Sequence, residues 1–118
     1  MYVNTQNHGD VTVFQVVPHR FDASLAHDVV AEALESAQDD CDTFLIDMEQ
    51  VTMIDSIGIG ALIRLMKSLG RERRLELCAL APRVHNVFRL TRLDGVFTIH
   101  PTLNDGLQAH YAQNAQIR

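Results

Sequence analysis

Two apolar runs around a short polar break constrain the fold of this chain more than any other feature. Residues 43–48 are too few for a typical helix and almost continuously apolar, which predicts a buried central strand. After residues 55–58, which read Asp-Ser-Ile-Gly, apolar residues recur at intervals of three and four as far as Leu69, which predicts a helix. Gly70 is suited to end that helix. We therefore expect a buried strand to lead into a helix that begins near Ser56.

The N-terminal third of the chain predicts a hairpin followed by a helix. Residues 2–6 and 11–17 have the composition of strands and flank a Gly-Asp turn signal. Residues 24–38 repeat their apolar side chains at helical spacing, and residues 22–24 offer side chains that can cap such a helix. The acidic pair at 39–40 lies where a helix dipole disfavours negative charge, so we expect the helix to stop before it.

The C-terminal half continues the alternation of strands and helices. We expect a strand at 75–80, a helix over Pro82–Leu90 with its proline in the first turn, a short strand at 96–99, and a last helix from about Leu103. Helical crossovers join the central strands, which makes those strands parallel, whereas the opening hairpin is antiparallel. The prediction is an α/β fold with a mixed, partly parallel β-sheet of about five strands and about four helices.

Length and charge restrict what such a fold does. A chain of 118 residues fits one compact domain, which we place at 1–112, followed by a polar C-terminal tail at 113–118. No apolar stretch approaches the roughly 20 residues that cross a bilayer, and the first residues lack the features of a secretion signal. We therefore expect a cytoplasmic protein without membrane insertion. A formal net charge of -5 disfavours nucleic acid as a partner.

Enzyme and metal motifs are incomplete in this sequence. Around Ser56, half of the Gly-x-Ser-x-Gly nucleophile motif is present, and residues 58–61 lack the lysine of a phosphate-binding loop. The six histidines form no pair at i and i+4, and the two cysteines, Cys41 and Cys78, match no metal spacing and are expected to be reduced. We expect no enzyme activity, no catalytic residue, no cofactor and no metal.

Ser56 is the residue whose position most needs an explanation. At or next to the start of a helix, it is followed by amides that have no partner within the helix, and the helix dipole favours an anion there. Gly58 and Gly60 leave room for another backbone or a large anion to approach. Two interpretations remain open at this point, a functional site and a serine that only caps the helix.

Three segments carry a resemblance to a known family. Residues 44–63 read Phe-Leu-Ile-Asp-Met-Glu-Gln-Val-Thr-Met-Ile-Asp-Ser-Ile-Gly-Ile-Gly-Ala-Leu-Ile and resemble the signature of STAS domains, the sulfate-transporter and anti-sigma-antagonist family. Residues 20–23, Arg-Phe-Asp-Ala, are similar to the start of that family's first helix, and residues 88–97 resemble its C-terminal block. The resemblance covers nearly the whole chain, which therefore looks like a free-standing anti-sigma factor antagonist.

This resemblance implies a partner switch. The unphosphorylated domain would bind an anti-sigma factor that is also a serine kinase, which releases a sigma factor, and phosphorylation of Ser56 would block the binding. A serine/threonine phosphatase would act on the phosphorylated form. The implied partner-binding residues are Asp22, Asp55, Ser56, Ile57, Gly58 and Gly60.

Three of these positions leave questions open. Asp22 and Asp55 either orient the kinase or only cap helices. Ile57 departs from the small, often hydroxylated residue that the family usually has after the acceptor.

A second function class also remains open. Some single STAS domains are accessory subunits that are not phosphorylated and dock on the ATPase of an ABC-type lipid transport system. In that case Ser56 would be structural.

Overall fold

The computed structural model describes residues 1–37 and 41–117, and beyond Tyr111 it describes the backbone alone. Within these residues a five-stranded sheet forms the centre. Its strands are β1 (Val3–His8), β2 (Val11–Val16), β4 (Thr43–Asp47), β6 (Arg74–Cys78) and β7 (Thr98–His100), in the order β1-β2-β4-β6-β7. The hairpin β1-β2 is antiparallel, and every other pair in this sheet is parallel. The predicted mixed, partly parallel sheet of about five strands is confirmed.

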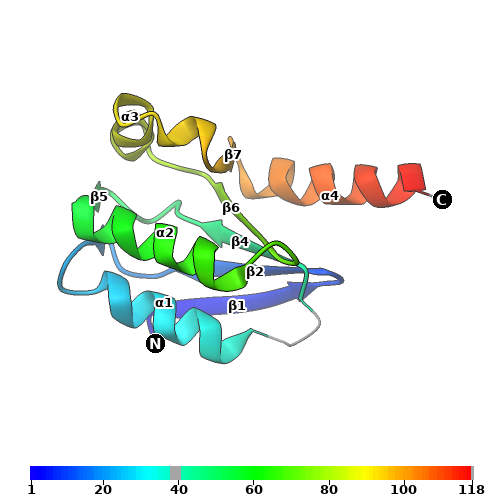
Figure 1. Ribbon diagram of the computed structural model, residues 1–118, viewed down its shortest axis with the longest axis horizontal. Coiled ribbons are helices and arrows are strands. Elements are labelled where there is room, and N and C mark those ends of the chain that lie inside the picture. The colour runs from blue at the N-terminus through cyan, green and yellow to red at the C-terminus, as the bar shows by residue number, and fades with distance from the viewer. Residues whose placement is uncertain (38–40, 118) are drawn as a thin grey trace.

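In the described part of the chain, four α-helices accompany the sheet, as predicted. They are α1 (Ala26–Ser36), α2 (Ser56–Leu69), α3 (Pro82–Leu90) and α4 (Leu103–Ile117). Figure 1 shows α1 and α2 side by side across one face of the sheet, whereas α4 begins beside β7 and contacts β6 and β7. Among the described residues, no helix combines the length and apolar character that crossing a bilayer requires.

Alternation along the strands divides the apolar side chains between the two faces of the sheet. On the face covered by α1 and α2, the rings of Phe14 and Phe44 stack with their centroids 4.8 Å apart, and Leu62 of α2 is buried with them. On the opposite face a smaller apolar cluster packs against α4. It contains Val11, Val13, Leu45 and Cys78, with Leu103 and Leu107 of the helix.

A buried polar cluster adds to the attachment of α4. Glu76 of β6 is only 7% exposed, and its Oε1 lies 2.7 Å from Nε2 of His100 on β7. The same oxygen lies 3.1 Å from Nε2 of His110 on α4. One carboxylate oxygen of β6 thus contacts both the neighbouring strand β7 and the helix α4.

The first helix begins later than the expected range 24–38. Its first residue is Ala26, and the cap position is Leu25, which supplies no side-chain hydrogen bond. Asp22 instead stabilises the preceding turn, because its backbone carbonyl accepts hydrogen bonds from the amides of Leu25 and Ala26. The helix ends at Ser36, before the acidic pair as expected, and residue 38 of the expected range lies outside the described residues.

The last strand is shifted from the expected range 96–99 to Thr98–His100. Residues 93–95 form a short 3₁₀ helix, η1 (Leu93–Gly95), and the amides of Val96 and Phe97 both donate to the carbonyl of Leu93. These turn hydrogen bonds keep Val96 out of the sheet.

A second, two-stranded sheet was not expected from the sequence. β3 (Arg20–Phe21) pairs in parallel with β5 (Met53–Ile54), and β5 leads directly into α2. The first turn of α2 lies against this small sheet, since a Cβ on Gly58 would overlap the backbone carbonyl of Phe21. Gly60, two residues further on, faces open space.

The two glycines of α2 provide a matched pair of substitutions. Gly58→Ala should destabilise the protein by about 2 kcal/mol or more, because the new methyl group collides with backbone that cannot rotate away. Gly60→Ala should stabilise it by about 0.5–1 kcal/mol, because alanine favours a helix and meets no obstacle. Urea denaturation followed by circular dichroism checks both values. Equal effects of the two substitutions would contradict the close packing of Gly58 on Phe21.

A carboxyl group is also buried at the end of β4, where its ionised form is disfavoured. Asp47 is 3% exposed and accepts one hydrogen bond, 3.0 Å long, from the amide of Glu49. Burial raises the pKa of this carboxyl above its ordinary value. Its neighbour in the register is Cys78, whose pKa burial and the charge of Asp47 raise to about 12, so that the thiol is neutral.

Asp47→Asn should therefore stabilise the protein at pH 7. The folded-state pKa of Asp47 lies above the unfolded value near 3.9, so the wild-type protein loses stability as pH rises through this window, whereas an amide does not ionise. The difference in unfolding free energy between variant and wild type should be near zero at about pH 3.5 and favour the variant at pH 7. Urea titrations across this range measure the difference. A variant that is less stable by the same amount at every pH would show that folding does not raise the pKa of Asp47.

Candidate functional site

The site is built around the start of α2, where Ser56 is the first helical residue. Ser56 is exposed, and among the described residues no group forms a hydrogen bond with its hydroxyl. The cap of the helix is Asp55, whose Oδ1 accepts a hydrogen bond of 2.8 Å from the amide of Gly58. The capping role that the sequence left open for Ser56 therefore belongs to Asp55, and the serine hydroxyl is free.

Asp55 also connects this helix to the loop before α1. Its second oxygen, Oδ2, accepts a hydrogen bond of 3.2 Å from the amide of Ala23. Both oxygens of the carboxylate are thus used by backbone amides of the protein itself. The loop at residues 22–24 and the first turn of α2 are held together by one side chain.

Asp22 shapes the neighbouring loop from inside. It is 4% exposed, and its Oδ1 accepts hydrogen bonds from the hydroxyl and the amide of Ser24, at 2.6 and 3.1 Å. Its Oδ2 pairs with the guanidinium of Arg20 at 2.9 Å. The Ser24 hydroxyl, together with the Ser24 amide and Arg20, holds the pKa of Asp22 below its usual value.

The supply of free amides at the helix start is smaller than expected. Of the amides of Ile57, Gly58 and Ile59, the second donates to the Asp55 carboxylate and the third to the Asp55 carbonyl. The cap and the first helical hydrogen bond satisfy them, and among the described residues only the amide of Ile57 has no partner. The end of the helix dipole still favours negative charge at this position.

Two large apolar side chains close to Ser56 in sequence are exposed. Ile57 is 44% exposed and Met53 is 37% exposed, although both are large apolar residues. Met53 was not identified from the sequence as a site residue, because nothing in the pattern distinguishes it from the other apolar residues of 51–54. Its exposure follows from the pairing of β5 with β3, which the sequence did not predict.

The residues that the sequence singled out are not all placed alike. Asp22, Asp55 and Gly58 are brought together through Ala23 and Phe21, and the first and third are buried. Ser56 and Ile57 are exposed. Gly60 is half-buried, and a Cβ at this position would have no atom within 4 Å. Among the residues the structure describes, no three His, Cys, Asp or Glu side chains are arranged to share a metal ion.

Solved structures with this fold include several anti-sigma factor antagonists. The chain is similar to an anti-sigma factor antagonist from Mycobacterium paratuberculosis, with 27% identity and a TM-score of 0.73 over 91% of each chain. It is similar to an anti-sigma-factor antagonist (STAS) domain protein from Planctomyces limnophilus, with 23% identity and a TM-score of 0.79 over 91% of this chain and 96% of that one.

A third similar structure is the Bacillus cell fate determinant SpoIIAA in its phosphorylated form, with 18% identity and a TM-score of 0.66 over 91% of this chain and 97% of that one. No curated protein matches the sequence significantly. The family model of the STAS domain matches residues 2–106, which is most of the chain. The chain belongs to the STAS domain family.

Proposed function

We propose that this protein is an anti-sigma factor antagonist that works as a partner switch. In its unphosphorylated form it binds an anti-sigma factor that is also a serine kinase, which releases a sigma factor. Phosphorylation of Ser56 blocks this binding, and a serine/threonine phosphatase restores it. The observation that carries the proposal is the exposed, unpartnered hydroxyl of Ser56 at the first position of α2.

A kinase needs a hydroxyl that it can reach and that the fold does not use. Ser56 meets both conditions, because Asp55 caps the helix in its place. Esterification of Ser56 therefore removes none of the hydrogen bonds that start α2. The kinase supplies ATP and Mg²⁺ from its own site, so the antagonist itself needs no catalytic residue and no cofactor.

The fold tolerates a phosphate at this position. A phosphoserine carries about -1.5 to -2 charges at pH 7, and the helix dipole stabilises negative charge at an N-terminus by about 0.3–1 kcal/mol. Asp55 is the nearest negative charge in sequence, but its two oxygens are directed at the amides of Gly58 and Ala23. These amides offset part of the repulsion between the carboxylate and the phosphate.

The same phosphate strongly affects a partner that covers Ser56. Met53 and Ile57, three residues before and one residue after Ser56, are exposed apolar side chains, which suits a dry contact with another protein near this serine. A charged, hydrated group in the middle of such a contact costs roughly 2–4 kcal/mol, which corresponds to a thirtyfold to thousandfold loss of affinity. The switch thus acts through the surface and leaves the interior unchanged.

Asp22 and Asp55 take part as positioning residues. Both carboxylates are occupied by hydrogen bonds within the protein, so they orient the kinase by holding the loop at 22–24 against the start of α2. Gly58 acts in the same way, because only glycine lets the helix lie this close to Phe21. Ile57 and Gly60 belong to the surface that the partner covers, and Ile57 enlarges its apolar part.

The proposal is tested with three variants and the candidate anti-sigma kinases from the same genome. Ser56→Asp should weaken binding by at least about thirtyfold, whereas Ser56→Ala should bind like the wild type. Ser68→Asp is the matched control, because Ser68 is also exposed and lies at the other end of α2. Isothermal titration calorimetry gives the affinities, and circular dichroism checks that all three variants remain folded.

Intact-mass analysis after incubation with kinase and ATP supplies the second test. One phosphate should appear on the wild type and none on Ser56→Ala. Absence of phosphate on the wild type, together with unchanged binding by Ser56→Asp, would contradict the partner switch. That result would favour the docking subunit of an ABC-type lipid transport system.

A further inference from the structure

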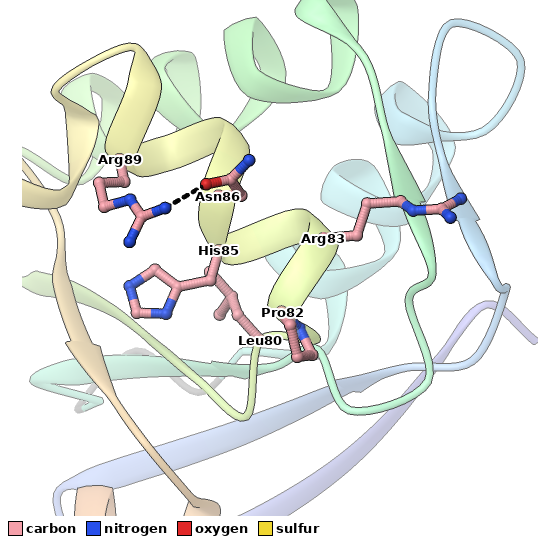
Figure 2. Close-up of a pocket in the computed structure, with 6 residues that line it drawn as sticks. All are labelled: Leu80, Pro82, Arg83, His85, Asn86 and Arg89. Atoms are coloured by element: carbon pink, nitrogen blue, oxygen red, sulfur yellow. Dashed lines mark hydrogen bonds between the residues drawn. The ribbon is translucent and has the colours of Figure 1, made fainter.

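A hollow beside α3 lies outside the Ser56 site as described. Its volume is about 600 Å³, and Figure 2 shows the side chains around it. All but one of the lining residues belong to α3, and the remaining one precedes the helix. They are Leu80, Pro82, Arg83, His85, Asn86 and Arg89.

The lining of this hollow is basic in an otherwise acidic protein. The chain has a net charge of -5, yet α3 contains two arginines and a histidine and no acidic residue. Among the described residues, neither Arg83 nor Arg89 forms an ion pair, and Arg89 donates only to the side-chain oxygen of Asn86 at 2.5 Å. These two guanidinium groups are therefore available to an external carboxylate.

The arrangement of the side chains suits an extended ligand. Figure 2 shows His85 and Arg89 on one side of α3, while Arg83 extends to the other side. A small anion cannot contact both arginines in this arrangement, whereas a chain segment that crosses the helix reaches both. The hollow therefore favours a polymer with several negative charges.

Apolar residues in the lining of the hollow and at the end of α3 favour a polypeptide as that polymer. Leu80 and Pro82 contribute apolar lining, and Leu90, the last residue of α3, is 73% exposed. Leu90 lies seven residues after Arg83, which is two helical turns, so both lie on the same side of the helix. Nucleic-acid binding relies on many phosphate contacts, for example about six to ten in a strongly salt-dependent complex, and two arginines in an acidic protein supply too few.

We propose that this hollow binds an acidic segment of a protein partner, with carboxylates on Arg83 and Arg89 and an apolar side chain against Leu80 or Leu90. α3 packs against β5, and β5 leads directly to Asp55 and Ser56. The helix that lines the hollow thus packs against the strand that precedes the Ser56 site. We assign the acidic segment to the anti-sigma factor, and this assignment rests on the proposed function.

The first experiment tests the hollow without that partner. The probe is a fluorescein-labelled peptide of four Glu-Glu-Leu repeats, and fluorescence anisotropy at low salt measures its binding. Arg83→Gln/Arg89→Gln should weaken binding about fivefold or more, and Arg83→Lys/Arg89→Lys should retain most of it. The matched control is Arg64→Gln/Lys67→Gln, which removes the same charge from exposed positions on α2 and should change binding less than about twofold.

Several results would overturn the assignment of an acidic peptide. They are an equal loss of binding in the control variant, equal binding of a Gln-Gln-Leu peptide, displacement of the probe by millimolar inorganic phosphate, or tighter binding of a short RNA. The last two would identify a small anion or a nucleic acid as the ligand. All variants are at exposed positions, and circular dichroism confirms that they are folded.

The second experiment measures the affinity of the same variants for the anti-sigma factor. The Arg83→Gln/Arg89→Gln variant should bind about fivefold or more weakly, with Ser56 still phosphorylated by the kinase, and the α2 control should bind like the wild type. Weak peptide binding, with an intact Ser56 switch, would refute only the proposal that the hollow binds an acidic segment. Strong peptide binding without any effect of Ser56→Asp on the anti-sigma factor would refute the partner switch alone.

Discussion

The carboxylate of Asp55 forms the contact on which the candidate functional surface depends. One of its oxygens caps α2 through the amide of Gly58, and the other binds the amide of Ala23 in the loop before α1. Ala23 and Asp55 are 32 residues apart in sequence, and the pairing of β3 with β5 brings them together. Gly58 completes the arrangement, because a larger residue would force the helix away from Phe21.

Asp55 and Ser56 thus have separate roles, because Asp55 caps the helix and Ser56 is the proposed site of modification. Asp55 satisfies the helix end, so Ser56 contributes nothing to it and is available for chemistry. A serine that capped its own helix would lose a hydrogen bond whenever it was phosphorylated. With an aspartate in that role, the phosphorylated form that we propose would keep the same backbone hydrogen bonds as the unphosphorylated form and would differ from it in surface charge.

The sequence predicted the large elements because periodicity reports burial directly. The run at 43–48 became a central strand, and the stripe that ends at Leu69 became α2 with Gly70 as its left-handed cap. The β3-β5 pair escaped prediction because strands of two residues have no periodicity, and their pairing is a long-range contact. The sequence also left open which residue caps α2. Asp55 and Ser56 are both good capping residues, and only the backbone geometry decides between them.

The cluster of Glu76, His100 and His110 has a consequence for the placement of α4. Apolar contacts such as those of Leu103 and Leu107 tolerate sliding and rotation, because they have no preferred direction. A hydrogen bond has a preferred direction, so the contact of His110 with the Glu76 oxygen that His100 also contacts restricts rotation of α4 about its own axis. The polar cluster therefore fixes the orientation of α4 on the sheet, which the apolar contacts alone would leave less well defined.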